Sequence, residues 1–266
     1  MLDISNRKRD EKLQLLNMIY QIREDHPTMG CRDLYYKLSP EFIGRDAFEE
    51  FCRANDLMSR KSKNYRRTTD SYGVTRFDNL LENIKVTRLN QAWTSDITYY
   101  DLGDRFYYLT FIQDAYSRRI LGHSVSESLH TEETTLPALK MALKNRNHTD
   151  LTGLIFHSDG GGQYYDKEFL KLTGKQKIHN SMCIYPWENG KSERLNGVIK
   201  NNYLRHKNIN TYNELKLKVD QTVLLYNIGK PHIRLNRNSP VAFEKNILLL
   251  QATNKADDDR VIRCKT

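Results

Sequence analysis

The sequence predicts a mixed α/β sheet covered by helices, preceded by a small all-α domain. Three segments in close succession, 92–102, 106–113 and 120–125, are rich in aromatic and β-branched residues and predict neighbouring strands. The chain before them shows only the periodicity of amphipathic helices. Helical patterns that follow the strands would cover the sheet, which is the layering of an α/β fold.

Composition describes a basic chain that can bury a core. Its 266 residues include 42 Lys and Arg against 33 Asp and Glu, a net charge of +9. No apolar run approaches the ~18 residues that span a bilayer, and no apolar segment near the start indicates a secretory signal. The four cysteines lack disulfide or zinc spacing, so we expect reduced thiols in a cytoplasmic protein.

The first 58 residues predict a helix-turn-helix-like DNA-binding domain. Apolar residues mark helices over 11–25, 32–38 and 45–55, with a turn at Ile43 and Gly44 between the last two. A basic linker is expected over 59–89. It contains five basic side chains without an acid between positions 58 and 67, which indicate either an exposed, solvated linker or a DNA-tracking arm: Arg60, Lys61, Lys63, Arg66 and Arg67.

The mixed α/β domain is expected over 90–207. After the first three strands come a helix over 131–145, a short strand over 154–156, and helices over 167–172 and 189–206. Residues 208–266 are expected to form a C-terminal helical extension.

Three carboxylates stand at positions that a folded sheet could bring together. Asp96 lies within the first strand, Asp159 directly follows the fourth, and Glu193 lies in the first turns of the helix over 189–206. Each alone has a structural explanation, as a strand-edge charge, a turn residue or a helix N-terminal acid. Together, three converging carboxylates suit a hard cation such as Mg²⁺.

Several ordered motifs resemble one known family. They are HPTMGCRDLY at 26–35, WTSDITY at 93–99, DAYSRRILG at 114–122, HSDGGGQY at 157–164, ENGKSERLNGVIK at 188–200 and YNIGKPHIRLNRNSP at 226–240. This series, over roughly 20–245, resembles insertion-sequence transposases with an Asp-Asp-Glu triad, of the insertion-sequence-three family. Their catalytic cores are similar to retroviral integrases.

The resemblance implies a ribonuclease H-like mixed sheet and metal-dependent DNA cleavage and strand transfer. Asp96, Asp159 and Glu193 would be both the catalytic residues and the ligands of two Mg²⁺ ions, for which Mn²⁺ can substitute. Lys200 matches a basic position that touches DNA, and Asn196 and Arg194 on the same helix are further DNA-binding candidates. Lys230 departs from the arginine of the family motif, which weakens the phosphate contact expected there.

The implied partner is double-stranded DNA, as element ends and as target. A homo-oligomer is expected because two ends must be joined, and a protein from an upstream reading frame would serve as fusion or partner. The location implied is the bacterial cytoplasm, at the nucleoid. One alternative is a catalytically silent, domesticated transposase that only binds DNA. Another, a ribonuclease H-like nuclease, would use Glu132 or Glu133 as a fourth carboxylate.

Overall fold

The computed structural model describes residues 2–59, 77–103, 105–147, 149–183 and 185–263. Its core is a five-stranded sheet in the order β3-β2-β1-β4-β5. The strands β1 to β3 pair antiparallel, whereas β4 and β5 continue the sheet parallel to β1. Their bounds are Ala92–Leu102, Arg105–Asp114, Ile120–Ser126, Ile155–Ser158 and His179–Met182. The mixed sheet predicted from the sequence is therefore confirmed.

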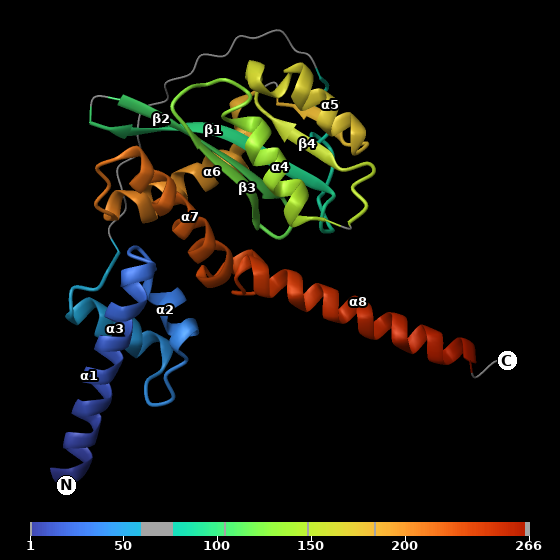
Figure 1. Cartoon of the computed structure of the whole chain (residues 1–266). Helices are drawn as coiled ribbons and strands as arrows, with labels where there is room; N and C mark the ends of the chain where they lie inside the picture. Colours follow the sequence, from blue (N-terminus) through green and yellow to red (C-terminus); the bar gives the residue numbers. More distant parts are fainter. Residues whose placement is uncertain (1, 60–76, 104, 148, 184, 264–266) are drawn as a thin grey trace.

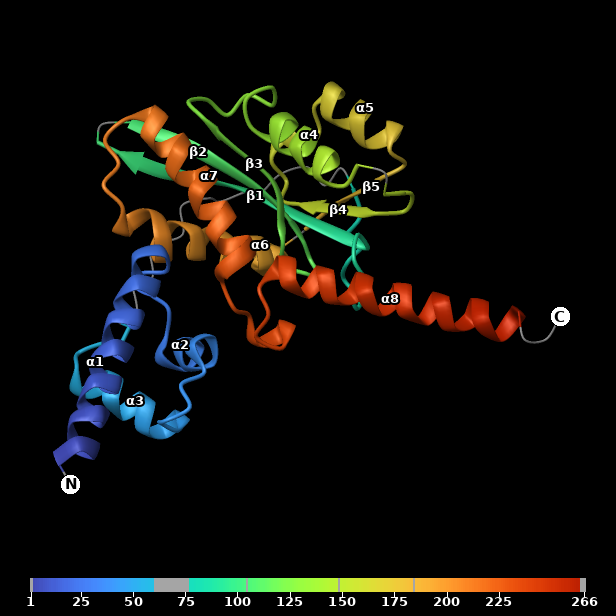
Figure 2. The same cartoon turned by 60° about the horizontal axis from the view of Figure 1, so that its bottom comes forward.

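Helices cover both faces of the sheet (Figures 1 and 2). On one face, α4 (Thr135–Asn145) and α5 (Lys167–Lys175) enclose a cluster that includes the fully buried Trp93. The helix α4 approaches β3 so closely that a Cβ on Gly122 would lie 2.0 Å from the carbonyl oxygen of Ala138. That position therefore requires glycine.

The opposite face is covered by α6 (Gly190–Val198) and α7 (Tyr212–Gly229). Leu109 and Phe111 of β2 are buried there with Leu195 of α6. Burial of each such side chain contributes about 1.5–3 kcal/mol to folding. Asp96 pairs with Phe111 across β1 and β2, so Asp96 belongs to the α6 face.

Some elements differ from the sequence-based expectations. The strand β5 was not predicted, because HNSM lacks both apolar alternation and β-branched residues. The expected helix over 189–206 changes type along its length, from α6 to a π-helical turn over Ile199–Tyr203 and a 3₁₀ turn over Leu204–His206. The C-terminal extension contains α7 and α8 (Pro240–Arg263), and α8 projects away from the core (Figure 1).

The N-terminal domain consists of three helices around a core of its own. These helices are α1 (Leu2–Asp25), α2 (Cys31–Leu38) and α3 (Arg45–Ala54). Their buried side chains form one cluster: Leu15, Ile19, Met29, Cys31, Leu34, Phe48, Cys52 and Leu57. The helical character predicted for this region is confirmed.

The C-terminal part of the expected linker is attached to the core. Residues 60–76 lie outside the described residues, but 77–89 run along the β4–β5 side of the sheet. The amide of Leu80 donates to Ser181 Oγ at 2.9 Å, and the ring of Phe77 stacks on Tyr165 at 5.5 Å. No helix of the described chain is long and apolar enough to cross a membrane.

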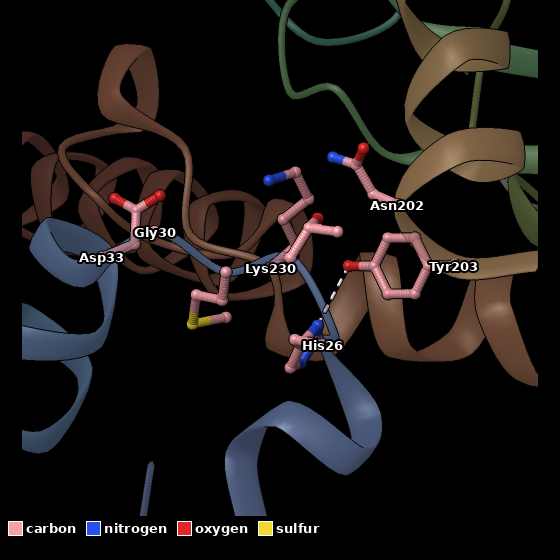
Figure 3. Close-up of a pocket in the computed structure, with 8 residues that line it drawn as sticks. His26, Gly30, Asp33, Asn202, Tyr203 and Lys230 are labelled. Carbon is pink, nitrogen blue, oxygen red and sulfur yellow. Dashed lines mark hydrogen bonds between the residues drawn. The ribbon is translucent and has the colours of Figure 1, made fainter. Parts of the chain in front are cut away.

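The N-terminal domain contacts the core through two of the sequence motifs (Figure 3). His26 Nδ1 lies 2.9 Å from the hydroxyl of Tyr203, in a buried hydrogen bond. Arg237 pairs with Asp33 at 2.8 Å. A cavity of about 50 Å³ lies beside the His26–Tyr203 bond, and Lys230 lines it. We call these contacts the interdomain joint. Lys230 thus stands at a domain contact.

Candidate active site

The site begins with the parallel register of β1 and β4. Thr94 pairs with His157, and two residues further along each strand direction come Asp96 and Asp159. Equal steps along neighbouring parallel strands bring two side chains to the same face of a sheet. The sheet therefore places these two carboxylates side by side, at the carboxyl end of β4.

The helix α6 adds the third carboxylate. Asn189, buried just before α6, donates from Nδ2 to the carbonyl oxygen of Ser95 at 3.0 Å, which fixes the start of the helix beside β1. Glu193 follows in the first turn of α6, and its charge acts on Asp96. The structure therefore brings Asp96, Asp159 and Glu193 to one place.

Asp96 carries the strongest electrostatic perturbation of the three. Burial, followed by repulsion from Asp159 and Glu193, raises the pKa of Asp96 to about 8. Asn196 opposes this shift, since its Nδ2 donates to Asp96 Oδ2 at 2.8 Å. Burial also raises the pKa of Asp159. Without a compensating positive charge, the site thus keeps a proton on a carboxylate near neutral pH.

A glycine loop orients Asp159. The amide of Gly161 donates to Asp159 Oδ1 at 3.1 Å. A Cβ on Gly161 would lie 3.1 Å from that same oxygen and 2.9 Å from Gln163 Oε1, whereas a Cβ on Gly162 would meet nothing within 4 Å. The loop that follows β4 therefore needs a glycine at 161 for the carboxylate to keep its position.

The donor set fits a divalent cation. Its oxygens are all carboxylate oxygens, which Mg²⁺ and Mn²⁺ prefer, and the raised pKa of Asp96 marks a site where added positive charge is stabilising. Within the described residues, no three His, Cys, Asp or Glu side chains are arranged to hold a metal ion. The carboxylates are thus neighbours that must draw closer to share a cation.

The predicted DNA-binding residues have different surroundings. The Lys200 ammonium donates to Thr98 Oγ1 at 3.0 Å and to the Tyr99 carbonyl oxygen at 2.8 Å, so it is engaged with β1. Asn196, also a DNA-binding candidate, is only 6% exposed and instead donates a hydrogen bond to Asp96. Arg194 is exposed. The candidates Arg60, Lys61, Lys63, Arg66 and Arg67 lie outside the described residues.

Two aromatic residues near Glu193 were not singled out together from the sequence. Tyr185 and Trp187 stack with ring centroids 4.5 Å apart, and Trp187 is 71% exposed on the short turn before α6. The only sequence signal was the pair of aromatic residues around Pro186. His157, by contrast, is buried, and its Nδ1 lies 2.9 Å from Ser181 Oγ.

Comparison with known proteins agrees with this architecture. Two models of the integrase core domain match residues 86–185 and 175–240. The insertion element IS600 uncharacterized 31 kDa protein of Shigella sonnei is 31% identical, over 91% of this chain and 90% of its own. The transposase for insertion sequence element IS629 of Shigella sonnei is 29% identical, over 84% of this chain and 75% of its own.

A solved structure is also similar in part. The catalytic core domain of HTLV-2 integrase, in complex with magnesium, is 21% identical with a TM-score of 0.46. The similarity covers 58% of this chain and 95% of that one.

The chain has a ribonuclease H-like integrase core, defined by the sheet order, the helices on both faces and the carboxylates beside the end of β4. Proteins with this core form a class of polynucleotidyl transferases. Within that class, the chain belongs to the insertion-sequence-three family of Asp-Asp-Glu transposases.

Proposed function

We propose that the chain cleaves and joins DNA at the ends of an insertion sequence, with Asp96, Asp159 and Glu193 as its catalytic and metal-binding residues. The observation that carries this proposal is the meeting of three carboxylates beside the end of β4, where burial, followed by repulsion from Asp159 and Glu193, raises the pKa of Asp96 to about 8. An acid whose pKa is raised by desolvation and by neighbouring carboxylates is typical of a catalytic or cation site.

Two Mg²⁺ or Mn²⁺ ions would be held by the three carboxylates, Asp96 contributing to both. When bound, they would supply activation of the attacking oxygen and stabilisation of the leaving oxygen. The relatives of known structure include an integrase core in complex with magnesium. The same site would serve hydrolysis at an element end and then attack by the freed 3′-hydroxyl on a second phosphodiester.

The chain's own groups prepare this chemistry. Asp96 must lose its proton, and the hydrogen bond from Asn196 favours the ionised form and fixes the carboxylate. The Gly161 amide does the same for Asp159. Asn189 holds α6 against β1, which keeps Glu193 in reach. These contacts would limit the movement needed for the carboxylates to close on a cation.

The remaining chain would bind DNA. Phosphate contacts would come from Arg194 and from the basic residues between 60 and 67, with Lys200 joining if it exchanged its partners on β1 for a phosphate. The N-terminal helices would take part in recognition of the element ends. Because two ends are joined, we propose a homo-oligomer, with an upstream-frame protein as fusion or partner, acting at the nucleoid.

The test is strand cleavage and joining on duplexes that carry the two ends of the element in which this gene lies. Wild type with Mg²⁺ or Mn²⁺ should yield a cleaved and a joined product, and Asp96→Asn, Asp159→Asn and Glu193→Gln should each yield none while still binding the duplex. Products from the triad variants would contradict the assignment. Binding without any product from the wild type, even after fusion to the upstream frame, would favour the silent DNA-binding alternative.

A further inference from the structure

Four basic side chains gather on the α6 side of the core, away from the helices α4 and α5. Arg118 comes from the turn between β2 and β3, Lys191 and Arg194 from α6, and Arg234 from the 3₁₀ turn over Ile233–Leu235. We call them the α6 basic cluster. Burial and then the charges of Arg234 and Arg194 lower the pKa of Arg118, and burial followed by Arg118 and Arg234 lowers that of Lys191. Arg118 is therefore repelled by Arg194 and Arg234, and Lys191 by Arg118 and Arg234.

The position of Arg118 is fixed by its turn. Arg118 has a left-handed backbone with φ of 64°, a conformation that costs energy for a residue other than glycine. Its amide donates to the Asp114 carbonyl oxygen at 2.9 Å. Gln113 Nε2 donates both to the Arg118 carbonyl oxygen at 2.9 Å and to the Tyr226 hydroxyl at 3.1 Å. These contacts hold the backbone that carries the Arg118 guanidinium in a fixed position.

The other residues of the α6 basic cluster come from segments that pack around the same residue, Tyr226. The ring of Tyr226 lies 5.2 Å from that of His232, and the His232 carbonyl oxygen accepts from the Leu235 amide, which closes the turn that carries Arg234. Leu195, between Arg194 and Asn196 on α6, is buried in one cluster with Tyr226. The four basic residues thus stand on one packed scaffold.

Compensating acids are scarce around the cluster. None of the ion pairs among the described residues includes any of its four members. Asp114 faces Arg118 and Lys191, but its carboxylate accepts the amides of Asn90, Tyr116 and Ser117. Glu193 lies between the two α6 members in sequence. The adjacent Arg119, in contrast, pairs with Glu244 at 2.7 Å.

We propose that the α6 basic cluster is a phosphate-binding site for duplex DNA. It would bind the DNA backbone next to the phosphate that lies at the carboxylate site. Guanidinium groups bind phosphate oxygens in pairs, and the density of uncompensated positive charge suits a polyanion. Because α6 carries both Glu193 and two cluster members, one duplex can reach both sites. This inference rests on the proposed function.

The test compares two double variants that each remove two positive charges. Arg118→Gln with Arg234→Gln removes half of the cluster, and Lys171→Gln with Lys175→Gln removes two exposed charges from α5 on the opposite face. Binding of the full chain to a fluorescent duplex of about 30 base pairs is measured in EDTA, across about 50–300 mM KCl. Thermal unfolding checks that both variants fold.

The cluster variant should bind about 10- to 100-fold more weakly near 0.1 M salt, and the slope of log Kd against log [KCl] should fall by about two. It should unfold at the same or a higher temperature than wild type, because repulsion is relieved. The α5 variant should keep the wild-type slope. Equal slopes for the two double variants would overturn the proposal. If the slope falls for the cluster variant but neither wild type nor the variants cleave the element ends, the phosphate-binding proposal is supported and the proposed catalytic function is contradicted.

Discussion

Asp96 of β1 and Asp159 after β4 occupy equivalent steps of two neighbouring parallel strands, two residues beyond the pair Thr94–His157. The geometry of the proposed catalytic site thus depends on strand register, since a slip by one residue would turn Asp96 to the α4 face. The loop after β4 completes the arrangement through the Gly161 amide.

The glycine loop gives a first prediction. Gly161→Ala would press a methyl group against Asp159 Oδ1, so strand cleavage should fall by about tenfold or more while the melting temperature changes little. Gly162→Ala is the matched control, because its Cβ would meet open space, and it should keep near-wild-type cleavage. Equal activity of the two variants would show that the loop does not position Asp159.

Removing the hydrogen bond to Asp96 should move the pH profile. In Asn196→Ala, the pKa of Asp96 loses an interaction that lowers it, so the rise of cleavage rate with pH should shift to higher pH. At saturating alkaline pH, part of the lost rate should return. A loss of rate that is the same at every pH would instead indicate a purely structural role.

The desolvation of Asp96 should also lower the free energy of unfolding. The pKa of Asp96 is raised from 3.8 to about 8, so the folded chain holds a proton that the unfolded chain releases between these values. Folding stability from this group is therefore present at low pH and falls as pH rises toward 8. Asp96→Asn should raise the free energy of unfolding in EDTA, by up to about 5 kcal/mol at pH 8.5 and little at pH 4.5. Urea unfolding at both pH values would decide this, and a pH-independent difference would contradict it.

The interdomain joint is tightly packed at Gly229. A Cβ there would lie 2.5 Å from His26 Nε2, so Gly229→Ala should lower the free energy of unfolding by about 1–3 kcal/mol. Gly197→Ala in α6 is the control, since its Cβ would lie 3.9 Å from the nearest atom and alanine favours helix. If both variants were equally stable, the joint would not constrain this position.

Acid should loosen the same joint. Burial and nearby lysines lower the pKa of His26 from 6.5 to about 4, so the unfolded chain takes up a proton first as pH falls. The stability that neutral His26 contributes is present above pH 6.5 and is lost as pH falls through 4. His26→Gln should therefore unfold with a smaller change between pH 7 and pH 4.5. An unaltered pH dependence would contradict this reading.

The sequence predicted the antiparallel strands well, because aromatic and β-branched residues dominate β1 and β2. It also predicted three carboxylates that the structure brings together. It could not predict β5, whose pairing to β4 depends on the tertiary position of a polar segment. Nor could it assign Asn196 to Asp96, because helix periodicity gives a face but not the partner across it.

The role of the YNIGKPH motif also required the structure. Its Lys230 has a lowered pKa because it is buried, and it lines the cavity beside His26, two hundred positions away in sequence. Local patterns carry no information about such a contact. In the same way, the α6 basic cluster joins residues from three separate segments, of which only Arg194 was a DNA-binding candidate from sequence.

The most direct test of the proposed cation site is a titration with Mn²⁺. Electron paramagnetic resonance measures how much Mn²⁺ the full chain binds while it is bound to an element-end duplex. Asp159→Asn removes a proposed ligand, and Asp166→Asn removes an equal charge at the N-cap of α5, where asparagine caps equally well. Wild type and Asp166→Asn should bind Mn²⁺ alike, and Asp159→Asn at least about tenfold more weakly. Equal Mn²⁺ affinity in all three proteins would contradict a cation site built from Asp96, Asp159 and Glu193.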